Sequence, residues 1–311
     1  MKRIPLGATD VTVPNVALGM MRIEHKSDDE IRELVHTARD AGIDFFDHAD
    51  IYGDEPAHGC ERRFAEALRL SPSQRDEVTI QSKTGIVKDG PYYDFSYDHI
   101  VDSVHGSLQA LGTDHLDVLL LHRPDPLVEP DEVARAFDYL AQAGKVRRFG
   151  VSNHTPRQID LLRKSVTQPI VANQVQLSIT HAPVVAQGVA ANIVGEEQAY
   201  TLDGGGVLDY CRLNDITVQA WSPFQSASAG VFLGSDRFPE LNGVLDRLAD
   251  KYDVAPIAIA TAWITRHPAQ VQVVLGTTTP ARVSAAAAGS DIPLTRPEWY
   301  ELFRVAGYRV P

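Results

Sequence analysis

The chain contains 311 residues, of which 44% are hydrophobic and 23% are charged. These proportions are typical of globular proteins and exclude a wholly disordered or low-complexity chain. The 41 acidic residues outnumber the 29 lysines and arginines, so the formal net charge is −12. Because an acidic surface repels phosphate groups, we expect neither a nucleic-acid partner nor an anionic membrane partner.

The cysteine content and the hydropathy pattern bear on the cellular location of the protein. Cys60 and Cys211 are the only two cysteines, and neither belongs to a CxxC pair, which suits a reducing environment. No apolar run approaches the roughly 20 residues that span a bilayer, and no signal-peptide pattern follows Met1. We therefore expect a cytoplasmic protein.

The predicted elements begin with a small hairpin over residues 1–15, which turns at Gly7. A strand follows over residues 16–20. The next helix begins after Ser27, because the acidic residues 28–30 favour the positive end of a helix dipole. It should end near Gly42, where glycine can adopt the left-handed conformation that closes many helices.

The same alternation continues along the chain. We predict further strands over residues 43–46, 78–82, 116–121, 146–151, 170–174, 216–220 and 271–275, with helices over residues 62–70, 97–111, 131–143 and 155–164. Eight short apolar strands separated by helices imply parallel pairing in a buried sheet, which is either an open doubly wound sheet or a closed barrel. Eight units without a linker favour an α/β fold: a single (β/α)8 TIM barrel domain over residues 1–311, with the hairpin as an N-terminal cap.

The segment over residues 181–206 departs from this pattern. It is irregular and ends in three glycines at residues 204–206. We predict a long loop with a short helix inserted after the sixth strand. The glycines do not follow a strand at phosphate-loop spacing, so a turn or hinge is the favoured interpretation.

Polar side chains follow the predicted strands where a barrel enzyme carries its chemistry, at the carboxyl ends. Asp47 and Tyr52 come after the second strand, Lys83 after the third and His122 after the fourth. Each alone has a structural explanation, such as a turn carboxylate or a core histidine. Four such residues at one face of a barrel favour a catalytic site.

The four residues also form a chemically coherent set. A free tyrosine has a pKa near 10, and a nearby lysine cation would lower it. Asp47 would keep Lys83 charged, while His122 could orient a carbonyl oxygen. This predicts a site that delivers a proton to an oxygen while another group attacks the carbon. No GxSxG nucleophile motif occurs.

These residues stand in motifs that resemble the aldo-keto reductase superfamily, and in particular a bacterial branch of predicted oxidoreductases. The motifs are FDHADIYG around Asp47 and Tyr52, QSKTG around Lys83, and LHRPDP around His122. The resemblance runs along the whole chain. It implies an NAD(P)H-dependent oxidoreductase that reduces the aldehyde or ketone group of a small molecule to an alcohol by hydride transfer, with Tyr52 as the proton donor.

The resemblance also implies NADPH as cofactor, with NADH possible, bound without the GxGxxG motif of a Rossmann fold, which the chain lacks. The implied cofactor contacts are Met20, Asp47, Ser152, Asn153, Gln174, Trp221, Ser222, Pro223, Phe224, Ser226, Gly276, Thr277, Thr278 and Arg282. Among these, Trp221 would stack on the nicotinamide, while Thr277 and Arg282 would hold the 2′-phosphate. On the substrate side we expect Met20, Met21 and Phe95.

Two departures from the family pattern bear on the cofactor and the pocket. Gly276 stands where many members have lysine, and Ala285-Ala286 stands where they have Glu-Asn, so the preference for NADPH over NADH stays open. A long C-terminal substrate loop is expected to be missing, which predicts a pocket that is more open or is closed by residues 181–206.

Two other functions compete with carbonyl reduction. The first is a metal-dependent barrel hydrolase or isomerase that uses Asp47, His48, Asp50 and His122 as ligands. The second is a non-catalytic NADPH-sensing module or partner subunit on the same fold. Our preferred interpretation assigns no metal ligands, and the sequence assigns no oligomeric state.

Overall fold

Eight parallel strands close into a barrel in the computed structural model, which describes residues 1–54, 57–190, 206–226 and 230–310. In chain order these strands are β3 (Val16–Gly19), β4 (Phe45–Asp47), β5 (Thr79–Thr84), β8 (Val118–Leu121), β9 (Phe149–Ser152), β10 (Ile170–Gln176), β11 (Thr217–Trp221) and β14 (Gln272–Leu275). Neighbours in the sequence are neighbours in the barrel, and β14 pairs with β3 to close it. The predicted TIM barrel is confirmed.

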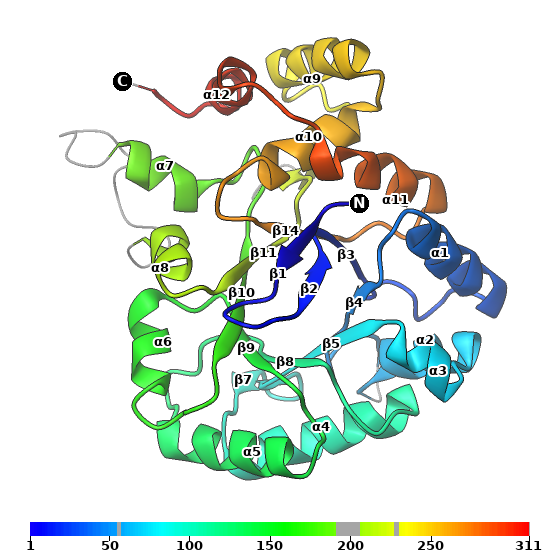
Figure 1. Ribbon diagram of the computed structural model, residues 1–311, viewed down its shortest axis with the longest axis vertical. Coiled ribbons are helices and arrows are strands. Elements are labelled where there is room, and N and C mark those ends of the chain that lie inside the picture. The colour runs from blue at the N-terminus through cyan, green and yellow to red at the C-terminus, as the bar shows by residue number, and fades with distance from the viewer. Residues whose placement is uncertain (55–56, 191–205, 227–229, 311) are drawn as a thin grey trace.

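Helices surround the barrel, as Figure 1 shows. They are α1 (Asp28–Asp40), α2 (Gly59–Leu68), α3 (Pro72–Asp76), α4 (Tyr97–Leu111), α5 (Pro130–Gln142), α6 (Pro156–Leu162), α7 (Pro183–Val189), α8 (Val207–Leu213), α9 (Pro239–Tyr252), α10 (Pro256–Thr265), α11 (Pro280–Ala287) and α12 (Arg296–Val305), with a 3₁₀ turn at Ala288–Asp291. Local sequence sets the ends of α1. Ser27 and Glu30 form a capping box at its start, and Gly42 has a φ of +84° just beyond its end.

The N-terminal hairpin closes the floor of the barrel. Its strands β1 (Arg3–Pro5) and β2 (Thr12–Pro14) pair antiparallel and lie over the middle of the barrel in Figure 1. The turn residue Gly7 has a φ of +59°, and a β-carbon there would lie 2.7 Å from Cα of Val171. Glycine is therefore required both for the turn and for the close approach to the barrel wall.

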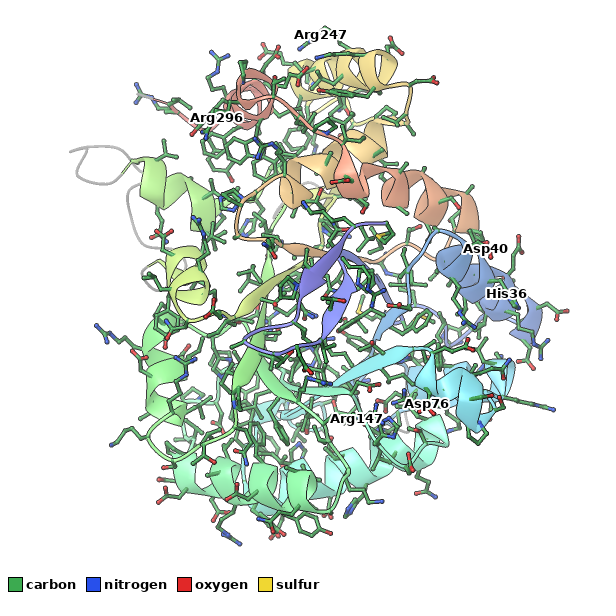
Figure 2. All side chains as sticks on the ribbon, in the orientation of Figure 1. His36, Asp40, Asp76, Arg147, Arg247 and Arg296 are labelled. Carbon is green, nitrogen blue, oxygen red and sulfur yellow. The ribbon has the colours of Figure 1, made fainter. Side chains whose placement is uncertain are left out.

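Apolar packing holds the barrel in two layers. Inside it, the hairpin residues Ile4, Leu6 and Val13 pack with Phe45 and Leu120 from the strands. Outside it, the strands and the surrounding helices share a larger buried core. Charged side chains such as His36, Asp40 and Arg247 point outward from their helices in Figure 2. This two-layer arrangement fixes where every strand ends, and therefore where the polar residues beyond the strands meet.

Several short elements were not predicted. They include helix α3 and two small hairpins, β6 (Ile86–Val87) with β7 (Tyr92–Tyr93) and β12 (Gln225–Ser226) with β13 (Gly230–Val231). The short helix expected within residues 181–206 is α7, and residues 191–205 of that prediction lie outside the described residues. Among the described residues, no helix has the length and hydropathy to cross a membrane. The cytoplasmic location stays a prediction.

Candidate active site

Lys83 stands at the centre of the predicted catalytic group. Its side chain is fully buried, and Nζ donates to Oδ2 of Asp47 at 2.7 Å and to the carbonyl of His48 at 2.8 Å. Nζ also lies 3.2 Å from the hydroxyl of Tyr52. The structure thus joins the carboxylate, the amine and the phenol in one hydrogen-bonded chain, as the sequence predicts.

The barrel register brings these groups together. Asp47 is the last residue of β4 and pairs with Gln81 of β5, two residues before Lys83. Residues two apart on a strand share a face, so Gln81 and Lys83 both point into the barrel beside Asp47. Tyr52 reaches Lys83 from the turn after β4, where its backbone N–H donates to Ala49.

The charges and burial of the group set its protonation. Burial raises the pKa of Tyr52, and the Lys83 cation only partly opposes this effect. Burial alone would favour a neutral amine, but Asp47 and then Tyr52 keep the pKa of Lys83 above its ordinary value. The Lys83 cation does act to lower the tyrosine pKa, as the sequence predicts, but desolvation of the phenolate outweighs it and the net shift is upward. The result is a protonated phenol beside a protonated amine.

His122 completes the group from the end of β8. Its ring meets that of Tyr52 edge-on, with the ring centroids 5.9 Å apart. Burial, followed by the charges of Lys83 and Arg123, holds the pKa of His122 well below its usual range. A neutral imidazole next to a protonated phenol can position a carbonyl oxygen through a hydrogen bond without competing for the proton.

A set of glutamines holds Asp47 from behind; of these, Gln174 was predicted from the sequence as a cofactor contact, whereas Gln81 and Gln219 were missed. Nε2 of Gln81 donates to Oδ1 of Asp47 at 2.6 Å, and Nε2 of Gln174 donates to the same oxygen at 3.0 Å. Both amides also approach Oε1 of Gln219, at 3.0 Å and 3.1 Å. Both oxygens of the Asp47 carboxylate are therefore held by donors, which fixes its orientation toward Lys83.

The same row of amides reaches the floor of the barrel. Nε2 of Gln219 donates to Oε1 of Gln272 at 2.8 Å, and Nε2 of Gln272 donates to the carbonyl of Pro14 in the hairpin at 2.7 Å. Gln219 and Gln272 are completely buried. The signal for this row was a glutamine in each of four strands, at a position that points inward by the two-residue period.

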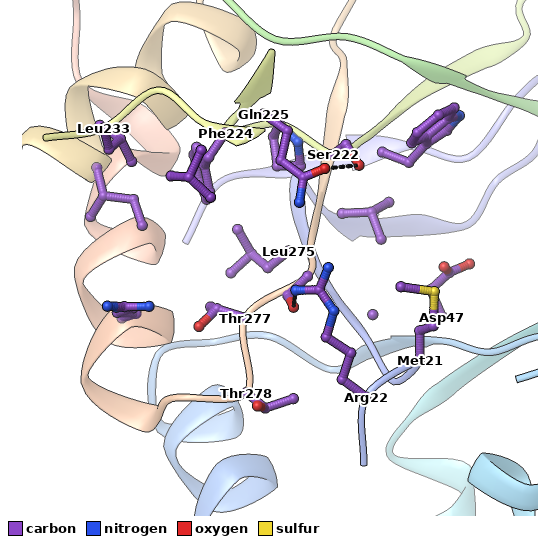
Figure 3. A pocket seen from close by; sticks show the side chains of 18 of the residues that line it. Met21, Arg22, Asp47, Ser222, Phe224, Gln225, Leu233, Leu275, Thr277 and Thr278 are labelled. Carbon is purple, nitrogen blue, oxygen red and sulfur yellow. Dashed lines mark hydrogen bonds between the residues drawn. The ribbon is translucent and has the colours of Figure 1, made fainter. Parts of the chain in front are cut away.

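A large cavity opens in front of the catalytic group. Its volume is about 1190 Å³, and it runs from Tyr52 and His122 past Trp221 to the start of α11. Figure 3 shows Asp47, Arg22 and Thr277 around this cavity, with Ser222 hydrogen-bonded to Gln225 on one wall. A cavity of this size, with apolar walls and a few convergent polar groups, is typical of a cofactor and substrate site.

Most of the residues predicted to hold a cofactor line this cavity. They are Asp47, Ser152, Asn153, Gln174, Trp221, Ser222, Pro223, Phe224, Gly276, Thr277, Thr278 and Arg282. Lys83 is not in the wall, because it lies buried behind Asp47 and Tyr52. Ser226 belongs to the short strand β12 and is not among the lining residues.

Two residues expected at the cavity lie in the core instead. Met20 is fully buried and packs in the apolar core, while its neighbour Met21 lines the cavity. Phe95 is also buried, and its ring stacks on that of His154 at 6.1 Å between centroids. Adjacent residues at a strand end project in opposite directions, so only Met21 faces the opening.

Asn153 links the wall of the cavity to His122, the predicted catalytic histidine. Its φ of +61° is a left-handed conformation that asparagine tolerates better than most residues. Its Nδ2 donates to the carbonyl of His122 at 3.3 Å and to Ser152 Oγ at 2.8 Å, while Oδ1 accepts from the Trp221 indole at 2.9 Å. This fixes the indole as part of the wall, with one lone pair of Oδ1 still available.

The other end of the cavity suits phosphate groups. Thr277 and Thr278 precede α11, and backbone N–H groups at the start of a helix attract anions. Arg282 is exposed in the first turn of that helix. Arg22, which was not predicted from the sequence, donates to the carbonyl of Gly276 at 3.1 Å. A cation therefore lies beside Gly276 although that residue carries no side chain.

The metal-site alternative finds no support in the geometry. Within the described part of the chain, the group of metal-ligand types that converges is Glu24, His25 and Asp54 at the surface, not Asp47, His48, Asp50 and His122. Asp47 is instead hydrogen-bonded to Lys83 and the glutamines.

The segment that was predicted to close the pocket does not contribute to it in the described residues. Within residues 181–206, none of the described residues lines the cavity.

Comparisons with known proteins identify the family. The model of the aldo/keto reductase family matches residues 15–305, which is nearly the whole chain. This chain belongs to the aldo/keto reductase family. It is accordingly an oxidoreductase that reduces carbonyl compounds, and the resemblance drawn from the motifs around Asp47, Lys83 and His122 is confirmed.

Bacterial relatives agree with this assignment to the aldo/keto reductases. The chain is 35% identical to uncharacterized oxidoreductase YcsN of Bacillus subtilis over 100% of both chains. It is 37% identical to oxidoreductase YdhF of Escherichia coli, over 88% of this chain and 86% of that protein. A 6-dehydroglucose reductase of Agrobacterium fabrum is 32% identical, with 98% of each chain covered.

Solved structures confirm the aldo/keto reductase fold. The thermostable aldo-keto reductase Tm1743, solved with the inhibitor epalrestat, superposes with a TM-score of 0.77 at 23% identity, covering 98% of this chain and 100% of that one. A deep-sea metagenome aldo-keto reductase, MGS-M4, gives a TM-score of 0.71 at 23% identity, with 97% and 94% covered. At these identities the likeness concerns the barrel itself.

Proposed function

We propose that this chain reduces aldehydes or ketones with NADPH as the preferred hydride source and Tyr52 as the proton donor. The observation that carries the proposal is the chain from Asp47 through Lys83 to Tyr52, which ends at the wall of a cavity large enough for a cofactor and a substrate. A buried phenol with a raised pKa stays protonated at neutral pH and can give its proton to a developing alkoxide.

Each residue has a distinct part in the proposed reaction. Tyr52 donates its proton to the substrate oxygen, and His122 hydrogen-bonds the same oxygen and orients the carbonyl. Lys83 stabilises the phenolate that is left behind, because its cation lies 3.2 Å from the hydroxyl. Asp47 and the glutamines hold Lys83 in place. When bound, the reduced nicotinamide supplies the hydride.

The residues present fit such a cofactor. Trp221 offers an aromatic face at the cavity wall, and Ser152, Asn153 and Gln174 lie beside it with polar groups near the base of the cavity. The start of α11 and Arg282 would hold phosphate groups at the far end. Because Arg282 can pair with a 2′-phosphate, we propose a preference for NADPH over NADH.

A titration with NADPH and NADH tests the cofactor assignment. Bound nicotinamide should quench the fluorescence of Trp221, and a Trp221→Phe variant should lose that part of the quenching. The other two tryptophans, Trp263 and Trp299, stack on each other at 4.9 Å between ring centroids and serve as the internal reference. Equal or tighter binding of NADH would contradict the proposed preference.

A substrate panel separates catalysis from sensing. We expect oxidation of NADPH in the presence of small aldehydes. A protein that binds NADPH tightly but reduces none of a broad range of aldehydes and ketones would instead be the sensing module considered from the sequence. Loss of activity on treatment with a chelator would favour the metal-dependent alternative.

A further inference from the structure

Arg123 is a cavity residue that the proposed reaction leaves without a role. It follows His122 directly in the chain and lines the same cavity. Its guanidinium carbon lies 5.4 Å from the centre of the Trp221 ring, so the charge is held over an aromatic face. The side chain is only partly exposed, and it stands at the catalytic end of the cavity.

The acids nearest to Arg123 are engaged elsewhere. Asp125, two residues away, accepts backbone N–H groups, Oδ2 from Phe95 at 3.1 Å and Oδ1 from Leu127 at 2.8 Å. Asp47 is bound to Lys83 and the glutamines. Over the described ranges of the chain, no carboxylate lies within 4.0 Å of the Arg123 guanidinium.

An arginine without an acidic partner in a partly buried cavity is a recognition element. Its charge has lost part of its hydration, and the planar guanidinium matches a carboxylate through two parallel hydrogen bonds. The cavity's two other lining arginines, Arg22 and Arg282, belong to its far end, beside Gly276 and in α11. They suit cofactor phosphates, whereas Arg123 stands beside the residues that hold the substrate carbonyl.

We propose that Arg123 binds a carboxylate of the substrate, and that the chain acts on carbonyl compounds that carry a carboxylate group. This inference rests on the carbonyl reduction proposed above. Ile51 and Ile86 line the same cavity and provide apolar contacts for the body of such a molecule. The hydride of NADPH passes to the carbonyl carbon and a proton to its oxygen, giving an alcohol and NADP⁺, while the carboxylate is unchanged.

Two aldehydes of nearly the same shape test the proposal. 4-Carboxybenzaldehyde carries the carboxylate, and 4-formylbenzamide carries a neutral amide in its place. The quantity to measure is the ratio of kcat/KM for the acid to kcat/KM for the amide. Comparing this ratio between variants cancels the intrinsic reactivity of the two aldehydes. Wild-type protein should favour the acid.

Arg123→Gln should lower the ratio roughly 10- to 100-fold, the range expected when a hydrogen-bonded charge pair is lost. Arg123→Lys keeps the charge without the planar fork and should retain part of the preference. Arg22→Gln removes the same charge from the other end of the cavity and is the matched control. Its ratio should equal that of the wild type, whatever its affinity for NADPH.

An unchanged ratio in Arg123→Gln, with both aldehydes still reduced, overturns the role of Arg123 and leaves the reductase function intact. An equal drop in Arg22→Gln overturns it as well, because the effect then belongs to the cavity's overall charge. If neither aldehyde is reduced, the proposed carbonyl reduction fails, and the role of Arg123 in holding a carboxylate is then tested by ligand binding. Calorimetric titration should then show 4-(hydroxymethyl)benzoate binding more tightly than 4-(hydroxymethyl)benzamide in wild type but not in Arg123→Gln. Equal binding by the wild type overturns it.

Discussion

Tyr52 combines two properties at the scale of a single residue: its hydroxyl lies beside a buried ammonium, and burial raises its pKa. In the reaction proposed above, the first property stabilises the phenolate that forms when the proton leaves, and the second keeps the phenol protonated at neutral pH. Removing the hydroxyl should therefore affect the chemical step much more than the affinity for the cofactor.

We predict that Tyr52→Phe reduces kcat by roughly 10²- to 10⁴-fold, the contribution typical of general-acid catalysis. Affinity for NADPH should be retained, because the hydroxyl faces the catalytic end of the cavity. Steady-state kinetics and a cofactor titration on the same preparation check this. A folded variant with undiminished turnover would remove Tyr52 from the mechanism.

Gln81 shows how a polar core residue is held. Its amide donates to Asp47 and to Gln219, and its own Oε1 accepts from Gln219 at 3.1 Å. Replacement by methionine keeps the length of the side chain but removes one hydrogen-bond donor from the buried Asp47 carboxylate and the hydrogen bonds that join Gln81 to Gln219. We predict a loss of about 1–3 kcal/mol in the free energy of unfolding, measured by chemical denaturation.

Gln142→Met is the matched control for this substitution, because Gln142 is exposed at the end of α5. Exposed substitutions of this kind change stability by less than about 0.5 kcal/mol. If both variants lose the same amount, the buried row of amides contributes nothing specific to stability.

The convergence of the predicted site residues could be predicted from sequence because Asp47, Lys83 and His122 each lie at or just beyond the carboxyl end of a strand, which places them at one mouth of the barrel. Gln81 and Gln219 could not, because a polar residue inside a strand is equally compatible with a solvent-facing position. Arg123 was visible only as part of a motif. Its proximity to Trp221 depends on how the loop after β8 lies against the end of β11, across the barrel mouth.

At the scale of elements, strand β9 lies closer to its neighbours than a side chain would allow. A β-carbon on Gly150 would come within 2.6 Å of Leu120 Cδ2 in β8 and 2.8 Å of the Ala172 carbonyl in β10. Overpacking of this kind costs about 1–3 kcal/mol. We predict that Gly150→Ala lowers the free energy of unfolding by that amount.

Gly243→Ala is the opposite case. Gly243 lies within α9, and a β-carbon added to it would meet no other atom within 4 Å. Alanine is favoured over glycine by about 0.5–1 kcal/mol inside a helix, so this variant should be more stable than the wild type. Thermal or chemical unfolding of the pair compares the two sites directly, and equal shifts would contradict the packing argument.

The eight strands and the helices α1, α2, α4, α5 and α6 could be predicted because each has a clear apolar period and a turn or capping residue at an end, whereas the longer helices α9 and α10 were not predicted. The hairpins β6–β7 and β12–β13 have two-residue strands, too short for any period to show. Their formation depends on packing against the rest of the molecule, as at Phe232 beside β13, which is fully buried in the apolar core. Local sequence carries little signal for elements of this kind.

At the scale of the whole molecule, buried histidines couple stability to pH. Burial lowers the pKa of His48 and of His154 to about 4, against 6.5 in an unfolded chain. Between pH 6.5 and 4 the unfolded chain binds protons that the folded protein refuses, so stability falls as the pH falls. Burial raises the pKa of Asp50 to about 6, which acts in the opposite direction.

We predict a net loss of at least about 3 kcal/mol in the free energy of unfolding between pH 7 and pH 4. His48 and His154 each contribute roughly that much, Asp50 offsets about one of them, and burial also lowers the pKa of His122 and of His267, which adds to the loss. Denaturant titrations at several pH values measure it. His154→Asn removes one titrating group while its amide can still donate to the Ser152 carbonyl, so its pH dependence should be shallower. A wild-type stability that is constant or rises toward pH 4 would contradict the prediction.

The row of glutamines that runs from the hairpin to Asp47 has a consequence for how such barrels diverge. Each amide hydrogen-bonds its neighbour, so replacing one with a hydrocarbon removes a partner from the next amide. Replacing all of them together removes partners only at the two ends of the row, from Oδ1 of Asp47 and the carbonyl of Pro14. Among related barrels, the row of glutamines should therefore be either present as a whole or absent as a whole, and few proteins should carry only part of it.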